Sequence, residues 1–469
     1  MIELKARKVA VLGLHDDGQS MLAALLKAGA LVTGFGTATL EQAQSIEAKL
    51  KGIKLIWNSI PKEGLLGFDL LIDTPGGGNF SQALSFAKEK GVQVLSDLDL
   101  ALEFMQAPLI AVTGTNGKST TVALIGEMLK AQGYKITLSG GDFSPWSERV
   151  LDKNKYDYHV LEVNSRRLEI SSNLHPHIAV LLNLFPAHGD RHKGGVPAYF
   201  EAKAKIFMNQ TEKDFLICDG NAKNVQELVK RKSGQSRMIP FSFGKEIIGS
   251  GVYTLGKKII ALGFSEREEA YSLLKSSSRA PTYLMDLMAA LSVARLCKVE
   301  NDKVQKVIDT FKPLTSRMEK VEVIGDVTFI DDSKSTNIGA TAWALSSFIQ
   351  PIIWIAGGKL VDGSQLRELP KLIKGKVRLV IVIGSEAKPL TNALQNFIPV
   401  LNVENLQQAV EIANKKAEPK DVVVYSPVCP PDYNIQGPGK ARGIEFRSCI
   451  SRLPKVPRVI RKLPHLSKI

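Results

Sequence analysis

The stretch AVTGTNGKSTT, residues 111–121, decides how the chain is interpreted. It follows an apolar run and joins two glycines to a lysine and several hydroxyl side chains. We expect a strand that ends at Val112 and a helix that begins near Lys118, so that backbone N–H groups between them point at phosphate oxygens. A plain glycine-rich turn with a helix cap is the alternative, but a lysine and two hydroxyls directly after a strand favour a phosphate-binding loop.

The residues of this loop have separate expected tasks in binding ATP. Lys118 brings a mobile positive charge to the β- and γ-phosphates, and Ser119 or Thr120 offers a hydroxyl to Mg²⁺. The first glycine of the longer G-x-x-x-x-G-K pattern would fall at Val112, so the match is to a shorter variant. The ATP-binding residues predicted from the loop are Gly114, Thr115, Asn116, Gly117, Lys118, Ser119 and Thr120. Hydrolases, kinases and ligases all use such loops, so other residues must indicate the reaction.

Length and composition restrict the class of protein. A chain of 469 residues suggests about three domains of ~150 residues each. Charged residues at 23% and aromatic residues at 7% are typical of a soluble globular protein, and no apolar run is long enough to span a membrane. The start, MIELKARKVAVLGL, leads straight into a strand, and the four cysteines have no metal-type spacing. We therefore expect a cytoplasmic protein with free thiols.

The net charge of +14 is compatible with nucleic acid, an anionic membrane surface or anionic small substrates as partners. The end of the chain, SRLPKVPRVIRKLPHLSKI, is densely basic, and no aromatic residues are interleaved with its basic ones. We predict a solvated tail over residues 456–469 and no nucleic-acid partner. Weak adhesion of the tail to an anionic surface is the alternative.

The first third of the chain alternates strand and helix patterns. The runs at 8–14 and 31–36 are apolar and rich in β-formers, whereas GQSMLAALLKAG at 18–29 has a helical period. This alternation predicts βαβ units and a parallel sheet. The first strand-to-helix turn, Gly13–Gly18, has two of the three glycines of a dinucleotide fingerprint, and no acid ends the second strand. We expect it to hold a nucleotide diphosphate and not NAD.

Two further α/β segments follow. The second contains apolar runs at 158–165, 178–185 and 214–220 and closes with two helices, and KPLTSR at 312–317 is interpreted as a hinge. The last contains four strand-like runs. We predict an α/β fold of three domains in series. They are a small Rossmann-like domain at 1–105, a central P-loop ATPase-type parallel-sheet domain at 106–312 and a Rossmann-like domain at 313–455.

Six short motifs occur in an order that resembles the Mur ligases. They are GTNGKSTT, LEVNS, NLFPAHGDRH, EAKAKIF, TSRMEKV and FIDDSKSTN. The resemblance covers nearly the whole chain, and it implies an ATP-dependent amide ligase of peptidoglycan precursor synthesis. The stretch 331–345, DDSKSTNIGATAWAL, is most similar to the members that add D-glutamate to UDP-N-acetylmuramoyl-L-alanine. In that reaction ATP phosphorylates the substrate carboxylate, and the amine of D-glutamate displaces phosphate from the acyl phosphate.

The resemblance also implies the residues of a magnesium site. Glu162 ends a predicted strand and is matched to a Mg²⁺ ligand, with an exposed strand-end charge as the alternative. His188 matches the histidine of a second Mg²⁺ site, although a lone loop histidine is usually polar surface. Lys203 lies in what otherwise reads as a solvated helix, but its offset from His188 matches the family's carbamylated lysine. Lys205 has the wrong register and is expected to be solvated. The predicted metal ligands are Ser119, Glu162, His188 and carbamylated Lys203.

The third domain is implied to supply further charged groups. Arg317 would contact the γ-phosphate, with a hinge salt bridge as its alternative. Asp332 and Lys334 would close over the nucleotide and the acyl phosphate, which requires a large domain closure. The predicted catalytic residues are Lys118, Glu162, His188, Lys203, Asp332 and Lys334. Asp286, Arg317 and Asp332 complete the predicted ATP site.

Substrate contacts are expected at the edge of the first sheet and beyond it. The predicted residues are Leu14, His15, Thr37, Gly76, Asn164, Ser165, Lys334 and Thr336. Several positions depart from the family pattern, namely Asp142, Asn164, Arg166, Arg167, Thr282, Tyr283, Asp286 and Pro431. Arg166 or Arg167 could compensate by binding a substrate carboxylate. Two alternatives therefore stay open: a Mur-type ligase with a different acceptor amino acid, and an ATP-binding paralogue without activity. We expect a monomer that uses ATP and Mg²⁺.

Overall fold

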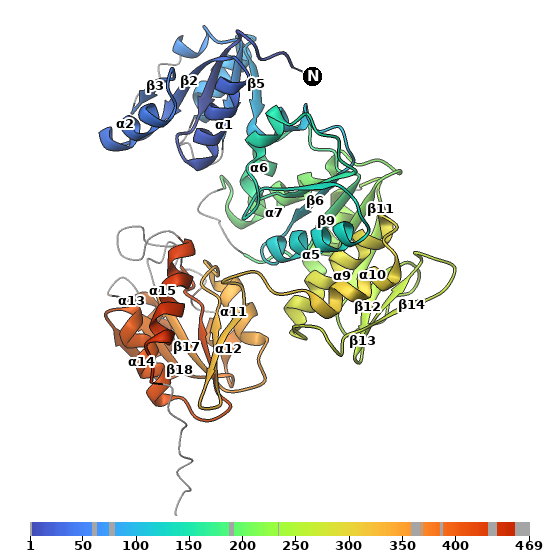
Figure 1. The fold of residues 1–469 in the computed structure, drawn as a ribbon, viewed down its shortest axis with the longest axis vertical. Coiled ribbons are helices and arrows are strands. Elements are labelled where there is room, and N and C mark those ends of the chain that lie inside the picture. The colour runs from blue at the N-terminus through green and yellow to red at the C-terminus, as the bar shows by residue number, and fades with distance from the viewer. Residues whose placement is uncertain are drawn as a thin grey trace, which may run out of the picture. The chain divides into compact units, whose positions relative to one another are not determined.

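The computed structural model of the chain has an α/β fold with three sheets (Figure 1). It describes residues 2–58, 63–74, 80–186, 192–232, 234–357, 366, 369–384, 388–429 and 439–454. The chain forms two compact units, one of Met1–Arg279 with Tyr283–Phe311 and one of Ala280–Thr282 with Lys312–Ile469. The first unit holds a five-stranded and a nine-stranded sheet, and the second holds a six-stranded sheet. The α/β prediction is confirmed, while the boundaries near 105 and 313 remain predictions.

The five-stranded sheet of the first unit is parallel, in the order β3-β2-β1-β4-β5. Its order reverses between β1 and β4, so the carboxyl ends of these strands form the crevice where such sheets bind ligands. The helix α2 begins with a capping box, in which Thr39 and Gln42 bond to each other's backbone N–H groups. The elements are β1 (Lys8–Leu12), α1 (Asp16–Lys27), β2 (Leu31–Gly36), α2 (Leu40–Lys49), β3 (Lys54–Trp57), η1 (Glu63–Leu65), β4 (Leu70–Asp73), α3 (Ser81–Glu89), β5 (Gln93–Ser96) and α4 (Asp97–Leu102).

The nine-stranded sheet has the order β14-β13-β12-β11-β10-β9-β6-β8-β7. Its strands from β7 to β12 are parallel, which places the ends of β6, β8 and β9 side by side. The strands are β6 (Leu109–Thr113), β7 (Ile136–Ser139), β8 (Tyr158–Glu162), β9 (Ile178–Leu181), β10 (Phe215–Asp219), β11 (Arg237–Ser242), β12 (Gly251–Leu255), β13 (Lys258–Leu262) and β14 (Glu269–Ser272). The helices are α5 (Lys118–Ala131), η2 (Trp146–Leu151), α6 (Ser165–Ile170), α7 (Gly195–Met208), α8 (Lys223–Lys232), α9 (Pro281–Leu296) and α10 (Asn301–Thr310).

The edge of this sheet differs from the sequence-based expectation of parallel strands alone. The strands β12, β13 and β14 pair antiparallel. Between β12 and β13 the chain reverses through Gly256, whose φ of 58° lies in the left-handed region that glycine adopts without strain. A two-residue connection of this kind joins antiparallel neighbours, and no crossover helix is needed.

The six-stranded sheet of the second unit has the order β15-β16-β20-β17-β18-β19 and is parallel except at β15. Four of its strands match the four predicted runs, and β15 and β19 were not predicted. The strands are β15 (Glu319–Ile324), β16 (Val327–Asp331), β17 (Ile352–Gly357), β18 (Val377–Ile383), β19 (Val400–Val403) and β20 (Val422–Tyr425). The helices are α11 (Ile338–Ser346), α12 (Leu369–Ile373), α13 (Lys388–Leu394), α14 (Leu406–Lys416) and α15 (Gly439–Ser451).

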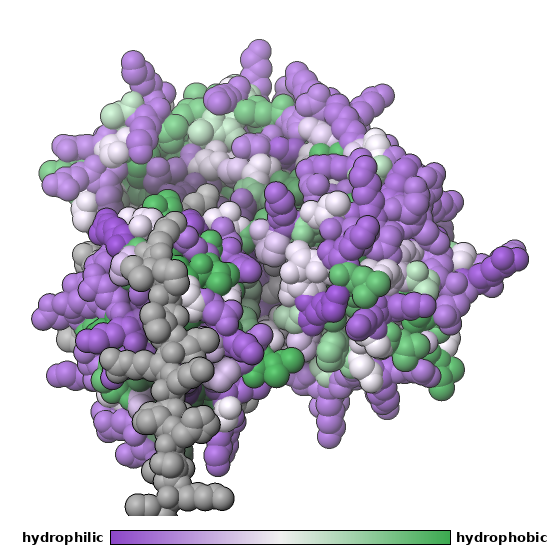
Figure 2. All heavy atoms as spheres, turned by 60° about the horizontal axis from the view of Figure 1, so that its bottom comes forward, coloured by the Kyte–Doolittle hydropathy of each residue, from purple (hydrophilic) through white to green (hydrophobic). Residues whose placement is uncertain are grey.

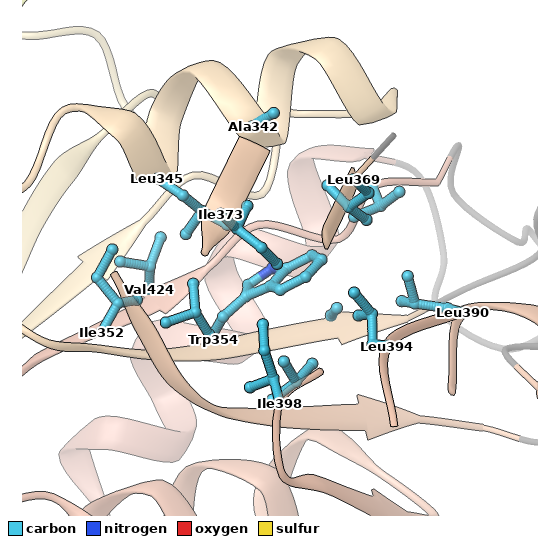
Figure 3. Close-up of a cluster of buried hydrophobic side chains, with 14 of the residues drawn as sticks. Ala342, Leu345, Ile352, Trp354, Leu369, Ile373, Leu390, Leu394, Ile398 and Val424 are labelled. Atoms are coloured by element: carbon cyan, nitrogen blue, oxygen red, sulfur yellow. The ribbon is translucent and has the colours of Figure 1, made fainter. Parts of the chain in front are cut away.

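Trp354 of β17 lies at the centre of one hydrophobic cluster of this unit (Figure 3). Its ring is fully buried among aliphatic side chains, including Leu345, Leu394 and Val424. The indole N–H donates a hydrogen bond of 2.8 Å to the carbonyl oxygen of Ser426. The buried polar atom is therefore satisfied, which a buried tryptophan requires.

The surface is mainly hydrophilic on the face drawn in Figure 2, where hydrophobic residues occur in small groups. Within the described ranges, no helix has the length and apolar character needed to cross a membrane. All four cysteines are free, as predicted, and the structure shows that all of them are buried.

Candidate active site

The phosphate loop, Gly114–Gly117, joins β6 to α5 at the positions expected from the sequence. Gly114 and Gly117 have φ angles of 158° and 87°, and the second precedes α5 as its N-cap. A Cβ atom at Gly117 would lie 2.0 Å from Oδ1 of Asp286. The glycine therefore lets α9 approach the loop, which brings Asp286 beside the predicted nucleotide site.

Asn183, which follows β9, forms hydrogen bonds with the backbone of the phosphate loop. Its side-chain oxygen accepts a hydrogen bond of 3.0 Å from the backbone N–H of Asn116, and its amide nitrogen donates one of 3.1 Å to the Asn116 carbonyl. The backbone N–H of Thr115 donates to the Asn183 carbonyl. Asn183 begins the motif NLFPAHGDRH, but no role was predicted for it from the sequence.

The side chain of Lys118 folds back across the loop. Its ammonium donates hydrogen bonds of 3.0 Å to the carbonyl oxygens of Gly114 and Thr115. The Thr115 hydroxyl accepts hydrogen bonds from the backbone N–H of Phe185 and from the hydroxyl of Tyr199. The ammonium is thus held at the carbonyl oxygens of the loop.

Ser119 and Glu162 meet at the carboxyl ends of β6 and β8. The Ser119 hydroxyl donates a hydrogen bond of 2.7 Å to Oε2 of Glu162, and both side chains are buried. A Cβ atom at Gly141, whose φ is 58°, would lie 2.2 Å from the same oxygen. The glycine thus makes room for the carboxylate. A carboxylate and a hydroxyl at a phosphate loop are hard oxygen donors of the kind that Mg²⁺ takes together with substrate phosphates.

Lys203 is the best-buried charged residue of this region, with 1% of its surface exposed. It lies on α7, and its amine donates hydrogen bonds of 2.7 Å to the Gly114 carbonyl and 3.3 Å to the hydroxyl of Thr113. Burial lowers the pKa of Lys203 well below its usual value, the charge of Lys118 lowers it further, and Glu162 opposes the shift. Lys205 on the same helix is exposed, as predicted.

His188 lies outside the described residues. Among those that the structure does describe, no group of three or more histidine, cysteine or acidic residues forms a metal site. A second histidine of the same loop, His192, is described and is buried. The ring Nε2 lies 3.0 Å from the hydroxyl of Ser165, and Nδ1 lies 3.3 Å from Oε2 of Glu169. Burial lowers the pKa of His192. This histidine, which had no predicted role, links α6 to the start of α7.

Arg167 has a different role from the one considered from the sequence. Its guanidinium is buried and lies 2.9 Å from the carboxylate of Asp97 and 2.8 Å from that of Asp17. It is therefore neutralised by the chain's own acids and is not open to a substrate carboxylate. Asn164, the predicted substrate residue, accepts a hydrogen bond from the backbone N–H of Arg167 as the N-cap of α6. Arg166 is half exposed and pairs with Glu169.

We expect Arg167→Leu to lower the free energy of unfolding by about 3 kcal/mol, because Asp97 would stay buried without its charge partner. Arg166→Leu is the matched control, since its exposed ion pair contributes about 0.5 kcal/mol or less. Urea unfolding of both variants at neutral pH measures the difference. Equal stability of the two variants would contradict the role of Arg167 as a structural cation.

The predicted substrate residues of the first sheet lie at its carboxyl edge. Leu14 and His15 follow β1, and Thr37 follows β2 and is exposed. Gly36 lies against Leu14, because a Cβ atom there would be 2.8 Å from the leucine Cγ. The structure therefore brings these residues together beside the N-terminus of α1. Gly76 lies outside the described residues.

In the second unit, Asp332 follows β16 and is buried beside Ser426, which follows β20. Its Oδ2 accepts hydrogen bonds of 2.6 Å from Ser335 and 2.9 Å from Ser426, and Oδ1 accepts one from the backbone N–H of Met318. Burial raises the pKa of Asp332 to about 7, although these hydrogen bonds and the charge of Arg317 oppose the shift. A carboxyl group with such a pKa exchanges a proton near neutral pH, which is common at functional sites.

The other predicted residues of this unit belong to two segments, 316–318 and 332–336, that hydrogen bonds join to each other. Arg317 is half-buried between Ser316 and Met318, which have φ angles of 62° and 53°. Positive φ at two non-glycine residues is strained, and such strain persists where the surrounding structure imposes it. The backbone N–H of Lys334 donates to the Ser316 carbonyl. Thr336 is half-buried, and Pro431 lies outside the described residues.

Comparisons with solved structures define the fold class. A pseudomurein peptide ligase type C from Methanothermus fervidus superposes with a TM-score of 0.59 at 17% identity, over 95% of this chain and 99% of that one. MurF ligase from Thermotoga maritima in complex with ADP gives a TM-score of 0.58 at 16% identity, over 96% and 99%. The architecture is that of the Mur-type ligases.

Comparisons of sequence define the family. The model of the Mur ligase middle domain matches residues 112–273, and that of the Mur ligase, glutamate ligase domain, matches residues 316–429. The UDP-N-acetylmuramoylalanine–D-glutamate ligase of Desulfatibacillum aliphaticivorans is 31% identical over 97% of this chain and 100% of its own length. The enzyme of the same name from Streptococcus mutans is 34% identical over 90% of this chain and 92% of its own length. The chain belongs to the Mur ligase family, which confirms the resemblance in its motifs.

Proposed function

We propose that the protein joins the carboxylate of UDP-N-acetylmuramoyl-L-alanine to the amine of D-glutamate, using ATP, in peptidoglycan precursor synthesis. One observation carries the ligase chemistry: Lys118, the Ser119–Glu162 pair and buried Lys203 all converge on the phosphate loop. The names of the relatives support D-glutamate as acceptor. Cytoplasmic location and a monomeric state are part of the same proposal.

The reaction has two steps in this proposal. A carboxylate oxygen of the nucleotide substrate attacks the γ-phosphorus of ATP, and ADP leaves. The neutral amine of D-glutamate then attacks the carbonyl carbon of the acyl phosphate, and inorganic phosphate leaves with the oxygen that came from the carboxylate. Both partners of the first step are anions, so catalysis depends on positioning and on neutralising charge.

The side chains of the first unit have distinct tasks. Lys118 moves from its loop carbonyls to the phosphates, where its charge offsets the negative charge that develops during transfer. The backbone N–H groups of the loop bind the same phosphates. Ser119 and Glu162 fit a Mg²⁺ ion that neutralises phosphate charge, with His188 as a further ligand. Leu14, His15 and Thr37 bind the uridine diphosphate end.

Lys203 is proposed to act as a carbamate. Carbamate formation requires a neutral amine and CO₂, and burial, which lowers the pKa of Lys203 well below its usual value, favours the neutral amine. The product carries a negative charge that offsets the charges of Lys118 and of Mg²⁺, whereas an ammonium at this place would repel both. A solvated surface lysine, the alternative considered from the sequence, does not agree with a Lys203 residue of which 1% of the surface is exposed.

The second unit is proposed to supply Arg317, Asp332 and Lys334 for the nucleotide and the acyl phosphate, and Thr336 for the substrate. Asp286 of the first unit is assigned to ATP. Domain boundaries near 105 and 313 are part of the proposal, since they separate the three sheets.

A phosphate-release assay tests this function. The protein is incubated with ATP, Mg²⁺ and UDP-N-acetylmuramoyl-L-alanine, and each of the common D- and L-amino acids is added in turn. D-Glutamate should give the highest rate. A clear preference for another amino acid would indicate a Mur-type ligase with a different acceptor, and no release with any acceptor would indicate an inactive paralogue.

A further inference from the structure

A cavity of about 810 Å³ lies in the first unit near the amino ends of β6 and β8, whereas the phosphate loop follows the carboxyl end of β6. Its lining comes from residues 2–5, 27–28, 104–107, 149–156 and 159. Most of these segments precede β1, β6 and β8, whereas the phosphate loop and Glu162 lie at the carboxyl ends of β6 and β8. The size is within the range of pockets that hold small organic ligands, and none of the roles proposed above uses it.

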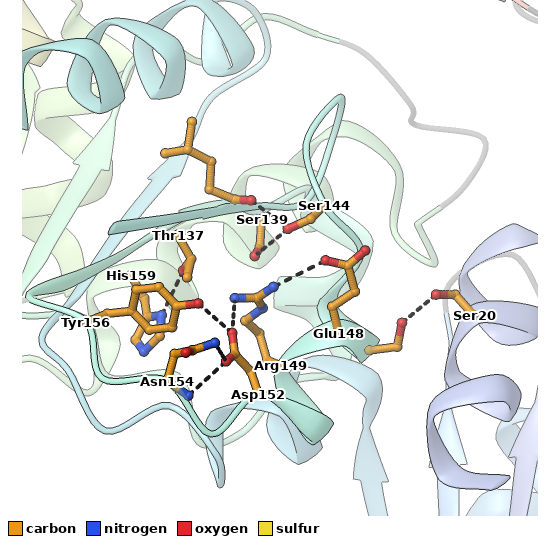
Figure 4. Close-up of polar contacts among 12 residues, drawn as sticks. Ser20, Thr137, Ser139, Ser144, Glu148, Arg149, Asp152, Asn154, Tyr156 and His159 are labelled. Carbon is orange, nitrogen blue, oxygen red and sulfur yellow. Dashed lines mark hydrogen bonds and ion pairs between the residues drawn. The ribbon is translucent and has the colours of Figure 1, made fainter. Parts of the chain in front are cut away.

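A set of polar side chains builds one wall of the cavity (Figure 4). Asp152 lies at its centre. Its carboxylate accepts hydrogen bonds of 2.8 Å from Arg149 and 2.8 Å from the hydroxyl of Tyr156, and others from the backbone and side chain of Asn154. Burial alone would raise the pKa of Asp152, but these donors outweigh it and the pKa is lowered. The acid is therefore ionised and fully engaged within the wall.

The cation of this wall keeps hydrogen-bonding capacity. Arg149 has 8% of its surface exposed, and its Nε–H has no acceptor among the residues that the structure describes. The ring of His159 lies beside Tyr156, and its Nδ1 is 2.7 Å from the hydroxyl of Thr137. Burial lowers the pKa of His159 to about 4, so this ring is neutral at physiological pH.

The lining as a whole is positively charged. It contains five basic side chains and two acidic ones, a net charge of +3 with neutral His159. The basic residues are Lys5, Lys27, Arg149, Lys153 and Lys155, and the acids are Glu3 and Asp152. The four lysines are exposed and therefore available to a ligand. A concave site of one sign raises the local concentration of ligands of the other sign.

Apolar side chains form the remaining lining. Phe104 and Met105, which precede β6, face the cavity together with Leu4 and Val150. Leu4 and Val150 are buried, and Phe104 and Met105 are partly buried. Apolar surface beside a ring of cations is complementary to a molecule that has an apolar group and an anionic group.

We propose that this cavity binds a small organic anion, an aromatic or branched apolar group that carries a phosphate or a carboxylate. The anionic group lies among Lys27, Lys153 and Lys155, and the apolar group packs against Phe104, Met105 and Val150. Tyr156 and Asn154 belong to the same lining and add polar groups to it. The ligand is distinct from ATP at the phosphate loop and bridges the start of the first sheet to the segment before β8.

Titration with 1-naphthyl phosphate tests this site. The full chain is first saturated with ADP and Mg²⁺, and binding is followed by fluorescence anisotropy of the naphthyl group and by calorimetry. We expect a dissociation constant below about 1 mM. The neutral 1-naphthol and the cationic 1-naphthylmethylamine should bind at least about tenfold more weakly, because the lining charge is positive.

A pair of double variants locates the binding. Lys27→Glu with Lys155→Glu should weaken 1-naphthyl phosphate binding by about tenfold or more, because both changes reverse charges of the lining. Lys51→Glu with Lys213→Glu is the matched control, since both lysines are exposed and lie outside the lining. No binding at about 5 mM, equal affinity for the three probes, or equal losses in the two double variants would each overturn the proposal.

Discussion

Replacing Lys118 by alanine should lower kcat/KM for phosphate release by about 10³-fold or more, which corresponds to about 4 kcal/mol of transition-state stabilisation. The physical reason is that the Lys118 ammonium lies 3.0 Å from two carbonyl oxygens of the loop, so the variant removes a positive charge from the proposed phosphate site. Its side chain is half-buried and is not one of the residues of the hydrophobic cluster around β6 and β8.

The thermal unfolding temperature should therefore stay within a few degrees of the wild-type value while activity is lost. Lys130→Ala is the matched control, because Lys130 lies on the same helix α5, is exposed and forms a surface ion pair with Glu127. Near-normal turnover of Lys118→Ala would mean that the loop is only a turn. A large loss of folded protein in that variant would mean that its effect is structural.

Replacing Lys203 by alanine should remove most of the activity, on the order of 10²-fold or more, because the proposed carbamate charge is lost. Acetate should restore part of it by placing a carboxylate in the vacated space, and acetamide of the same size should not. Lys205→Ala, two residues along α7 and exposed, should behave like the wild type. Full activity of Lys203→Ala, or equal impairment of both variants, would contradict the assignment.

The pH dependence of stability tests the state of the same amine without measuring activity. The pKa of Lys203 is lower in the folded chain than in the unfolded chain. Between these two values the unfolded chain binds more protons, so stability rises with pH. In CO₂-free buffer, the stability of the wild type relative to Lys203→Met should rise with pH, by up to about 1.4 kcal/mol per pH unit, as the pH approaches the ordinary lysine pKa of about 10.4 from below. A constant difference would mean that the amine is an ordinary ammonium.

Much of the fold follows from patterns that are local in the sequence. The βαβ alternation, the end of β6 and the start of α5 were predicted because apolar period and glycine position act over a few residues. The strands β15 and β19 were missed because their alternation is weak and their faces are partly exposed. The antiparallel pairing of β12 with β13 and of β13 with β14 was also missed. The sequence does not show which strands are partners, and so it does not distinguish a hairpin turn from a crossover connection.

The residues of the candidate site are likewise of two kinds, those that sequence motifs predict and those that only folding brings to the site. Lys118, Ser119 and Glu162 were predicted from motif order, and they meet because parallel strands end at one edge of a sheet. Asn183 and Tyr199 could not be predicted, because their contacts with the phosphate loop join segments more than sixty residues apart. Arg166 or Arg167 was considered as a ligand of a substrate carboxylate, whereas the partners of Arg167 are acids that only folding brings near.

An isotope-transfer measurement tests the central claim, amide formation through an acyl phosphate, most directly. UDP-N-acetylmuramoyl-L-alanine is labelled with ¹⁸O in the alanine carboxylate and incubated with ATP, Mg²⁺ and D-glutamate. Mass spectrometry of the products then follows the label. We predict that each inorganic phosphate released carries one ¹⁸O and that one amide product forms per phosphate. Unlabelled phosphate, or phosphate released without amide product, would contradict the account.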